Sequence, residues 1–355
     1  MSDTRLCSLR LLAQLLVPCC NLSVLDLGHL HWAGDSLEPL VALPSLQSLA
    51  VGNISQLGTL GNAVPLLARL TALQLAHCPY GTPGSFCSRG LRMGALSACS
   101  NLQLLKLPEC GQWAAPAWSR ILSSLTKLTH LELHLKSEAL LGQPLQPSRS
   151  PFPSSLSSSL VSLELWDCEG VVSLPPLPQL GQLTKLVLHS LSDLTSLLPL
   201  SSLSSLQQLR LDAMFNVGCL APLSHLTRLM VLNLGMCGVG CVEPLAPLTR
   251  LTTLKLMWVD GFVEGLDLRP LESLSHLREL CVDAIPPGDQ GVLGVSGLLE
   301  HMAGLPFRYL VNLTLPLDSN AEACPSSPGL RDLRRSTTCT TTLGLAWQRS
   351  APSHH

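Results

Sequence analysis

The sequence is poor in charged and aromatic residues, and the shortage of charge excludes two classes of partner. Charged residues make up 13% of the 355 residues, about half the share of an average globular chain, and aromatic residues make up 4%. The formal net charge is −2. Nucleic acids and anionic membranes bind surfaces rich in clustered Lys and Arg. We therefore expect neither to be the main partner.

The sequence also lacks an apolar run long enough to cross a membrane, although its mean hydropathy is +0.34. The best candidate, Leu194–Leu209, has 16 residues and carries Ser or Gln in nearly every turn. A spanning helix needs about 20 mainly apolar residues. At the N-terminus, Asp3, Arg10 and Gln14 interrupt a leucine cluster, which makes a poor signal peptide. We expect no membrane span and no secretion, and we interpret the three N-glycosylation patterns as chance matches.

Motifs of catalysis and metal binding are missing as well. The 14 cysteines form no C-x-x-C pair, and no Cys/His group has the spacing of a zinc site. No Gly-rich phosphate loop, G-x-S-x-G elbow or H-E-x-x-H helix occurs. The sequence therefore predicts a protein without catalytic residues, metal or cofactor.

Leucine, in contrast, is abundant: it occupies 85 of the 355 positions, about 24%. A conventional core mixes Leu, Val, Ile and Phe, so this excess indicates one structural slot that recurs. The segment Leu-x-x-Leu-x-Leu occurs in twelve copies, spaced by 22 to 33 residues, and Val51 and Val282 fill its third slot in two copies. The copies begin at Leu22, Leu46, Leu70, Leu102, Leu128, Leu160, Leu183, Leu206, Leu229, Leu251, Leu277 and Leu310.

Each copy predicts one strand and one helical return. The second half of the motif has period two, which is typical of a short strand with alternate residues pointing inward. The period then changes to three, as in Leu220, Leu223 and Leu226, which favours a short 3₁₀ or irregular helical segment. One unit cannot bury its own leucines, but stacked units bury them in a continuous ladder. The sequence thus predicts an α/β solenoid.

This pattern resembles the leucine-rich-repeat family over roughly residues 16–317. The units from Leu183 to Leu277 are similar to the short 22–23-residue class of internalins and cytosolic phosphatase regulators. The stretch Cys99–Cys110 looks like the cysteine-containing class, common in substrate receptors of ubiquitin ligases. The resemblance implies a curved horseshoe with a parallel sheet on the concave face, helical returns on the convex face, and non-catalytic binding of a protein.

The sequence departs from the family pattern in two respects. The usual turn Asn is replaced throughout by Cys or an aliphatic residue, so we expect no Asn ladder between turns. The F-box helices of ubiquitin-ligase receptors have no visible counterpart. Six cysteines occupy repeat slots, where we expect small buried apolar residues and hence a cytoplasmic, reducing environment: Cys19, Cys78, Cys99, Cys110, Cys168 and Cys237.

The repeat pattern divides the chain into three parts. Residues 1–21 form a predicted helical cap, because Leu6, Leu9, Leu12, Leu15 and Leu16 make an apolar stripe. Residues 22–317 form a solenoid of about twelve repeats. Residues 318–355, rich in Ser, Thr and Pro, predict a disordered tail. The last repeat then lacks a cap, which would leave an edge for end-to-end contact. Three repeats carry insertions, at 79–94, at the Ser/Pro-rich loop 137–159, and at 286–309, where 292–303 predicts a helix.

The residues between the strand leucines face the predicted concave surface, and repeats five to eight carry the unusual ones. Trp and Arg are over-represented among interface hot spots, so our first hypothesis is a protein-binding patch there; the alternative is a solvated polar face that binds nothing. The neighbouring Glu132 and Glu164 could in principle do acid–base chemistry, but the surface is open and shallow, which disfavours it. The patch comprises His130, Glu132, His134, Glu164, Trp166, Asp167, Lys185, His189 and Arg210.

A second hypothesis is an apolar patch of Met230, Met236, Met257 and Trp258, since an exposed Met/Trp cluster suggests a protein contact. The alternative is that Trp258 packs into the turn. The sequence thus favours an interaction scaffold whose protein partner is unidentified. Two further classes stay open by family analogy: a substrate-recognition subunit of a ubiquitin ligase, and a structural component of the ciliary axoneme or cytoskeleton.

Overall fold

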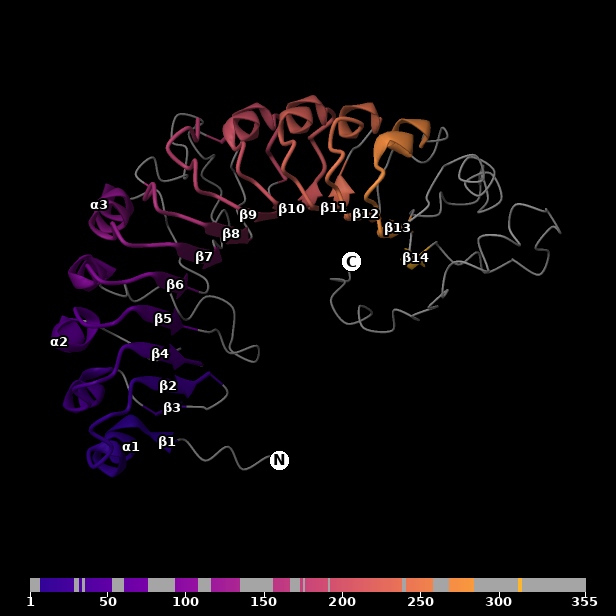
Figure 1. Cartoon of the computed structure of the whole chain (residues 1–355). Helices are drawn as coiled ribbons and strands as arrows, with labels where there is room; N and C mark the ends of the chain where they lie inside the picture. Colours follow the sequence, from indigo (N-terminus) through magenta and orange to yellow (C-terminus); the bar gives the residue numbers. More distant parts are fainter. Residues whose placement is uncertain are drawn as a thin grey trace, which may run out of the picture.

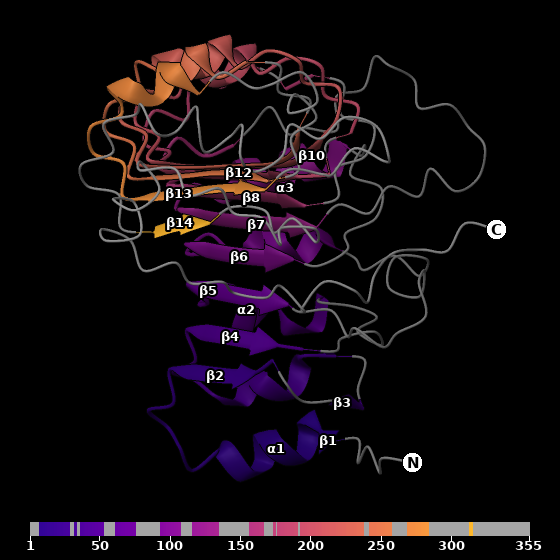
Figure 2. The same cartoon turned by 90° about the vertical axis from the view of Figure 1, so that its right-hand side faces the viewer.

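The chain folds into an arch whose inner side is a parallel sheet and whose outer side carries short helical returns (Figure 1). Viewed from the side, the strands follow one another as rungs (Figure 2). This computed structural model describes residues 7–28, 32–33, 36–52, 61–75, 93–107, 116–134, 156–166, 173–174, 176–190, 192–237, 241–257, 268–283 and 312–314.

Twelve strands form the sheet, and each begins two residues after a leading leucine of the repeat motif. Neighbours in the sheet are consecutive repeats, all paired in parallel. The horseshoe fold predicted from the motif is therefore confirmed. The strands are β2 (Val24–Leu27), β4 (Ser48–Val51), β5 (Ala72–Leu75), β6 (Leu104–Leu107), β7 (His130–His134), β8 (Ser162–Trp166), β9 (Lys185–His189), β10 (Gln208–Met214), β11 (Val231–Cys237), β12 (Thr253–Met257), β13 (Glu279–Asp283) and β14 (Asn312–Thr314).

The core is a ladder of leucines at equivalent positions of successive repeats. In β4 and β5, for example, Leu49 pairs with Leu73, and both are fully buried. Full burial of one leucine stabilises the fold by about 1.5–3 kcal/mol. Because each repeat covers the leucines of the next, this stabilisation depends on stacking rather than on any single unit.

Most returns are 3₁₀ helices, as the period of three predicts. In η5, the N–H of Leu200 bonds to the carbonyl of Leu197, and that of Leu203 bonds to Leu200. A proline near the first position fixes the backbone angle that starts several of these helices. They are η1 (Glu38–Ala42), η2 (Gly61–Ala63), η3 (Met93–Ala98), η5 (Leu198–Ser202), η6 (Ala221–His225), η7 (Glu243–Leu245) and η9 (Arg269–Ser273). Two returns differ, because α2 (Val64–Leu67) and α3 (Pro116–Ser124) are α-helical.

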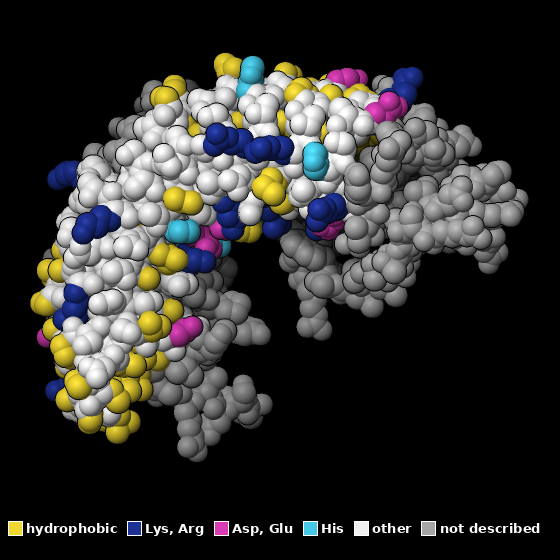
Figure 3. Space-filling view, in the orientation of Figure 1, with side chains coloured by type: hydrophobic (Ala, Val, Ile, Leu, Met, Phe, Trp, Pro, Cys, Tyr) yellow, Lys and Arg dark blue, Asp and Glu magenta, His cyan; other side chains and the backbone are white. Residues whose placement is uncertain are grey.

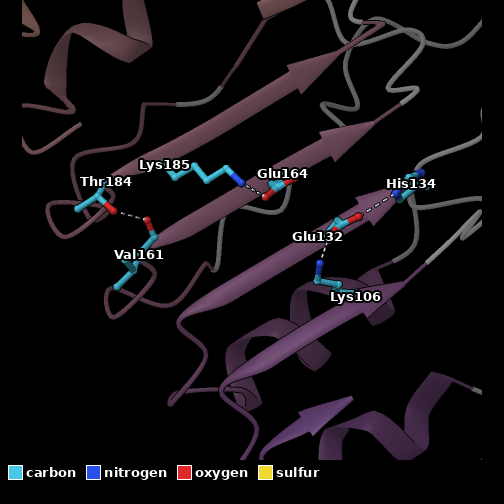
Figure 4. A network of polar contacts seen from close by, with 7 residues as sticks. All are labelled: Lys106, Glu132, His134, Val161, Glu164, Thr184 and Lys185. Atoms are coloured by element: carbon cyan, nitrogen blue, oxygen red, sulfur yellow. Dashed lines mark hydrogen bonds and ion pairs between the residues drawn. The ribbon is translucent and has the colours of Figure 1, made fainter. Parts of the chain in front are cut away.

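Threonines add a second tie between repeats, which the sequence analysis did not foresee. A threonine directly after the leading leucine donates its hydroxyl to a backbone carbonyl of the preceding repeat in several units. Thr184, for example, donates to the carbonyl of Val161 at 3.2 Å (Figure 4). Thr129 and Thr252 do the same toward Gln103 and Met230.

Cysteines partly follow the prediction. Cys99 and Cys237 are buried, and burial raises the pKa of the Cys99 thiol to about 12. The thiol of Cys237 donates to the carbonyls of Leu211 at 3.5 Å and Gly235 at 3.1 Å. It thereby supplies one of the turn contacts that the missing Asn would make. Cys19 is exposed, so its predicted burial is wrong; it precedes β2, which lies at the edge of the sheet.

The N-terminal helix α1 (Leu9–Leu16) packs on η1, but the predicted apolar stripe is only partly right. The helix buries Leu9 and Ala13, whereas Leu15 is 75% exposed and Leu11 is also largely exposed. A spacing of three residues drifts around an α-helix of 3.6 residues per turn, which places Leu15 on another side. Apolar side chains gather on this end of the molecule (Figure 3). Before the helix, β1 (Cys7–Ser8) pairs with β3 (Trp32–Ala33).

Several predicted segments lie outside the described residues. They are residues 79–92 of the first insertion, residues 137–155 of the Ser/Pro-rich loop, the insert 286–309 with its predicted helix, and the tail 318–355. In the described part of the chain, no helix has the length and apolar content needed to cross a bilayer.

Candidate protein-binding surface on the concave face

Three aromatic side chains stack on the concave face, at the ends of three consecutive strands. His134 on β7 and Trp166 on β8 are paired residues, and their rings are 5.5 Å apart and nearly parallel, at 9°. Trp166 and His189 on β9 follow with centroids 4.9 Å apart and tilted by 33°. The guanidinium carbon of Arg210, from β10, lies 5.8 Å from the Trp166 ring centroid. We call these four side chains the Trp166 ladder.

Two ion pairs lie beside the ladder (Figure 4), because their carboxylates, Glu132 and Glu164, stand two residues before His134 and Trp166 on the same strands. Lys106 Nζ lies 2.8 Å from Glu132 Oε2, and His134 Nε2 lies 3.2 Å from Glu132 Oε1. The hydrogen bond to His134, supported by that to Lys106, outweighs burial and lowers the pKa of the Glu132 carboxyl to about 2. On the next two strands, Lys185 Nζ from β9 lies 2.6 Å from Glu164 Oε1 on β8.

Arg210 is held by a buried carboxylate. Its Nε donates to Asp212, which is only 8% exposed. Asp212 faces Gly235 on β11, and a Cβ built on Gly235 would lie 2.2 Å from Asp212 Oδ1. Gly235 therefore leaves the room in which Asp212 can hold Arg210 near Trp166.

The cations reach farther out than the carboxylates that hold them. The side chains of Lys106, Lys185 and Arg210 are 42%, 41% and 45% exposed, against 21%, 18% and 12% for their acidic partners. Charged and histidine side chains are visible along the inner side of the arch (Figure 3). An approaching molecule thus meets ammonium and guanidinium groups and the edges of aromatic rings.

The first predicted patch is largely brought together. Its members on β7 to β10 share one face of the sheet. Every residue of the Trp166 ladder was named from the sequence, whereas Lys106, which pairs with Glu132, was not. His130 lies at the other end of β7, where its Nδ1 is 2.9 Å from Thr129 Oγ1. Asp167 lies outside the described residues. Glu132 and Glu164 are paired across strands as predicted, but each bonds its own cation.

No site for a metal ion emerges from this surface. Within the described ranges, no three His, Cys, Asp or Glu residues are grouped so that they could hold one.

The second predicted patch is divided. Met257 is exposed and pairs with Gly235, next to which Met236 lies with a positive φ of 47°. Met230 directly precedes β11 and is five residues from Gly235, or about 17 Å along the strand. Trp258 lies outside the described residues.

Sequence reasoning missed Asp212 and Gly235 as parts of the site. One signal could have found them: an acid and a glycine occupy the same repeat position in successive units, directly after the aromatic residues. Three consecutive strand ends also have positive φ at non-glycine residues, namely Ser190, Ala213 and Met236.

Comparison with solved structures places the fold in a known class. An internalin (inlF) from Listeria monocytogenes superimposes with a TM-score of 0.51 and 17% identity, over 88% of this chain and 89% of the internalin. Internalin C2 from the same bacterium gives a TM-score of 0.43 and 23% identity, over 72% of this chain and 92% of that one. No protein-family model matches the sequence, and comparison with curated proteins finds no significant match.

The chain is therefore a leucine-rich-repeat protein by fold. Its architecture is similar to that of the internalin inlF, and the short repeats resemble the internalin class.

Proposed function

We propose that this protein is a non-catalytic scaffold that binds another protein on its concave face, with the Trp166 ladder at the centre of the contact. The observation that carries the proposal is the stacking of Trp166 between two imidazoles beside a guanidinium. Aromatic and Arg side chains dominate interface hot spots. Because these side chains are already fixed by stacking and ion pairs, binding costs little conformational entropy.

The geometry favours a polypeptide over a nucleic acid as the partner. Single-stranded nucleic acids bind by stacking bases on exposed aromatic faces. Trp166 is already stacked with the imidazoles of the two neighbouring strands, so its ring is occupied by the protein's own side chains. The outward cations Lys106, Lys185 and Arg210 suit partner carboxylates, which can join the existing pairs as further acceptors. We infer a partner segment with an apolar side chain and acidic neighbours.

Two features of the carboxylates support the non-catalytic part of the proposal. Glu132 and Glu164 are held in ion pairs, and they lie on an open sheet, whereas acid–base catalysis needs a carboxyl with a raised pKa in a closed site. We further propose that the protein works in the cytoplasm, because buried thiols such as Cys99 serve as core residues. The ubiquitin-ligase and axonemal alternatives rest on class analogy alone, so they enter the test as outcomes.

Affinity purification with mass spectrometry tests the proposal. The bait is the full chain, as wild type, as Trp166→Ala and as Leu198→Ala; Leu198 is exposed on η5, on the outer side of the arch. We expect the specific partners to be lost with Trp166→Ala and retained with Leu198→Ala. Recovery of a cullin adaptor would support the ligase class, and recovery of tubulin or dynein the axonemal class. Retention of every specific partner by Trp166→Ala would refute the proposed contact.

A further inference from the structure

Two exposed cysteines occupy equivalent positions at the starts of consecutive returns. Cys219 lies two residues before η6 and Cys241 two residues before η7, and both are free and exposed. In other repeats the same position holds a serine, Ser36 or Ser196, whose hydroxyl accepts the N–H two residues on at 3.0 or 3.2 Å. Cys219 makes the same contact through Sγ, at 3.5 Å. The thiols therefore stand in a capping position that serine can fill.

The two returns are neighbours. Strands β10 and β11 are paired in register up to Met214 and Cys237, and the helices that follow them lie side by side on the outer side of the arch (Figures 1 and 2). Neighbouring repeats are about 5 Å apart at the strands on the inner side of the arch, and the curvature spreads them farther on the outer side, where the returns lie. A disulfide needs Cα atoms about 4.4–6.8 Å apart. The stacking of equivalent positions thus makes Cys219 and Cys241 neighbours, since η6 and η7 contact each other, and a bond between them requires the two returns to approach.

Electrostatics agrees with this placement. Hydrogen bonding to the Glu243 carboxylate raises the pKa of the Cys241 thiol, and so does the charge of the nearby Cys219. Among the described cysteines, Cys99 and Cys237 are buried and cannot compete for an oxidant in solution. Cys219 and Cys241 are the exposed thiols that the repeat places in register.

We propose that Cys219 and Cys241 form a modification site, a dithiol that closes to a disulfide across two consecutive repeats when it meets a small disulfide oxidant such as glutathione disulfide. The Cys219 thiolate, after loss of its proton to solvent, attacks one sulfur of the oxidant and releases one glutathione thiolate. The Cys241 thiolate, formed by loss of its proton, then attacks Cys219 Sγ in the mixed disulfide and releases the second. Two electrons pass from the protein thiols to the oxidant.

The link would fix the spacing of the repeats behind the Trp166 ladder. The residues that position Arg210, namely Asp212 and Gly235, belong to the two repeats that the disulfide joins. We therefore expect oxidation to slow amide exchange in β10 and β11 by between about 30-fold and about 1,000-fold, because a cross-link over a loop of this length restricts the opened state.

Peptide mapping after oxidation tests the proposal. The full chain is reduced, desalted and incubated with defined ratios of glutathione disulfide to glutathione. Trypsin then separates the peptides 211–228 and 229–250, which contain Cys219 and Cys241. We expect one cross-link between them and the loss of two hydrogens from the intact mass. Cys219→Ser and Cys241→Ser should abolish the cross-link, and Cys20→Ser, an exposed control, should not.

Both serine variants should fold, because serine fills the same position at Ser36 and Ser196. Glutathione attached separately to each cysteine, without cross-linking, would overturn the proposal. So would a cross-link that survives in Cys241→Ser, since peptide 229–250 also contains Cys237. A further variant, Glu243→Gln, should speed the closing step near neutral pH because it removes the carboxylate that keeps Cys241 protonated. An unchanged rate would overturn the role of Cys241 as the closing thiol.

Discussion

Gly52 offers a sharp test of how tightly the first repeats stack. It follows β4, and its N–H bonds to the carbonyl of Leu27 at 3.2 Å. A Cβ on Gly52 would lie 1.9 Å from the carbonyl oxygen of Gly28 in the preceding repeat. An ordinary contact of this kind is about 3.5 Å. The variant Gly52→Ala must therefore move the ends of β2 and β4 apart.

The cost can be estimated from its parts. Overpacking a tight contact costs about 1–3 kcal/mol, and losing the bond from Gly52 to Leu27 costs about 0.5–1.5 kcal/mol. Restricting the unfolded chain by the change from Gly to Ala returns about 0.4–1 kcal/mol. We expect a net loss of about 2 kcal/mol. Gly28→Ala is the matched control, because its Cβ would meet only the tip of the exposed Asp26 side chain, at 3.1 Å.

Hydrogen–deuterium exchange by mass spectrometry measures the effect repeat by repeat. Each repeat contacts only its neighbours, so the loss should stay near β2 and β4. We expect amides there to exchange about thirtyfold faster in Gly52→Ala, the factor that about 2 kcal/mol gives, and amides of β9–β12 to be unchanged. Equal exchange in the two alanine variants, or an equal effect throughout the sheet, would refute the reasoning.

Three further predictions concern single side chains. Gly235→Ala should displace Asp212 and weaken partner capture by the concave face, with little change in melting temperature; unchanged capture would show that the position of Asp212 does not matter. Cys99→Ser should lower the free energy of unfolding by about 1–3 kcal/mol, because the change buries a hydroxyl. In the wild type, the buried Cys99 thiol, whose pKa is about 12, should react with Ellman's reagent only after unfolding, whereas the exposed Cys219 should react in the folded protein. Folding lowers the pKa of Glu132 from 4.5 to about 2, so the stability that its ionised carboxylate contributes is present above pH 4.5 and is lost as the pH falls toward 2. The free energy of unfolding, measured with urea across this range, should therefore depend less on pH in Glu132→Gln than in the wild type, and an equal dependence in the two proteins would contradict the assignment.

The fold could be predicted from the sequence because its determinants are local and repeated. Period two after each leading leucine gives a strand, and period three gives a 3₁₀ return. The period of three did not predict that the returns α2 and α3 are α-helical. Unit length does not explain it, because the 3₁₀ helices η1 and η9 lie in units of the same 24 and 26 residues. Leu15 was misplaced because the apolar residues of α1 were counted at a spacing that an α-helix does not keep.

The site could be predicted only as far as the repeat dictates it. The register alone implies that His134, Trp166 and His189 share a row of the sheet. It does not specify that Arg210 crosses β9 to reach Trp166, because that contact depends on the rotamer of a long side chain. Nor does it specify Asp212 as the group that holds Arg210, since burial of that carboxylate depends on the missing Cβ of the next repeat.

The separation between leucines that fix the fold and variable residues that form the surface explains where binding specificity must lie. The leucine ladder fixes backbone spacing whatever residues occupy the positions between, so exchanging those residues changes the surface and leaves the fold. Along the row that contains Trp166, other repeats hold Gly28, Gly52 and Met257, none of which can stack. Only the three consecutive aromatic residues create a rigid wall, and the half-buried Trp166 is its middle member. Replacing Trp166 should therefore remove binding while costing far less stability than replacing any one of the buried leucines beneath it, for which about 2–5 kcal/mol is expected.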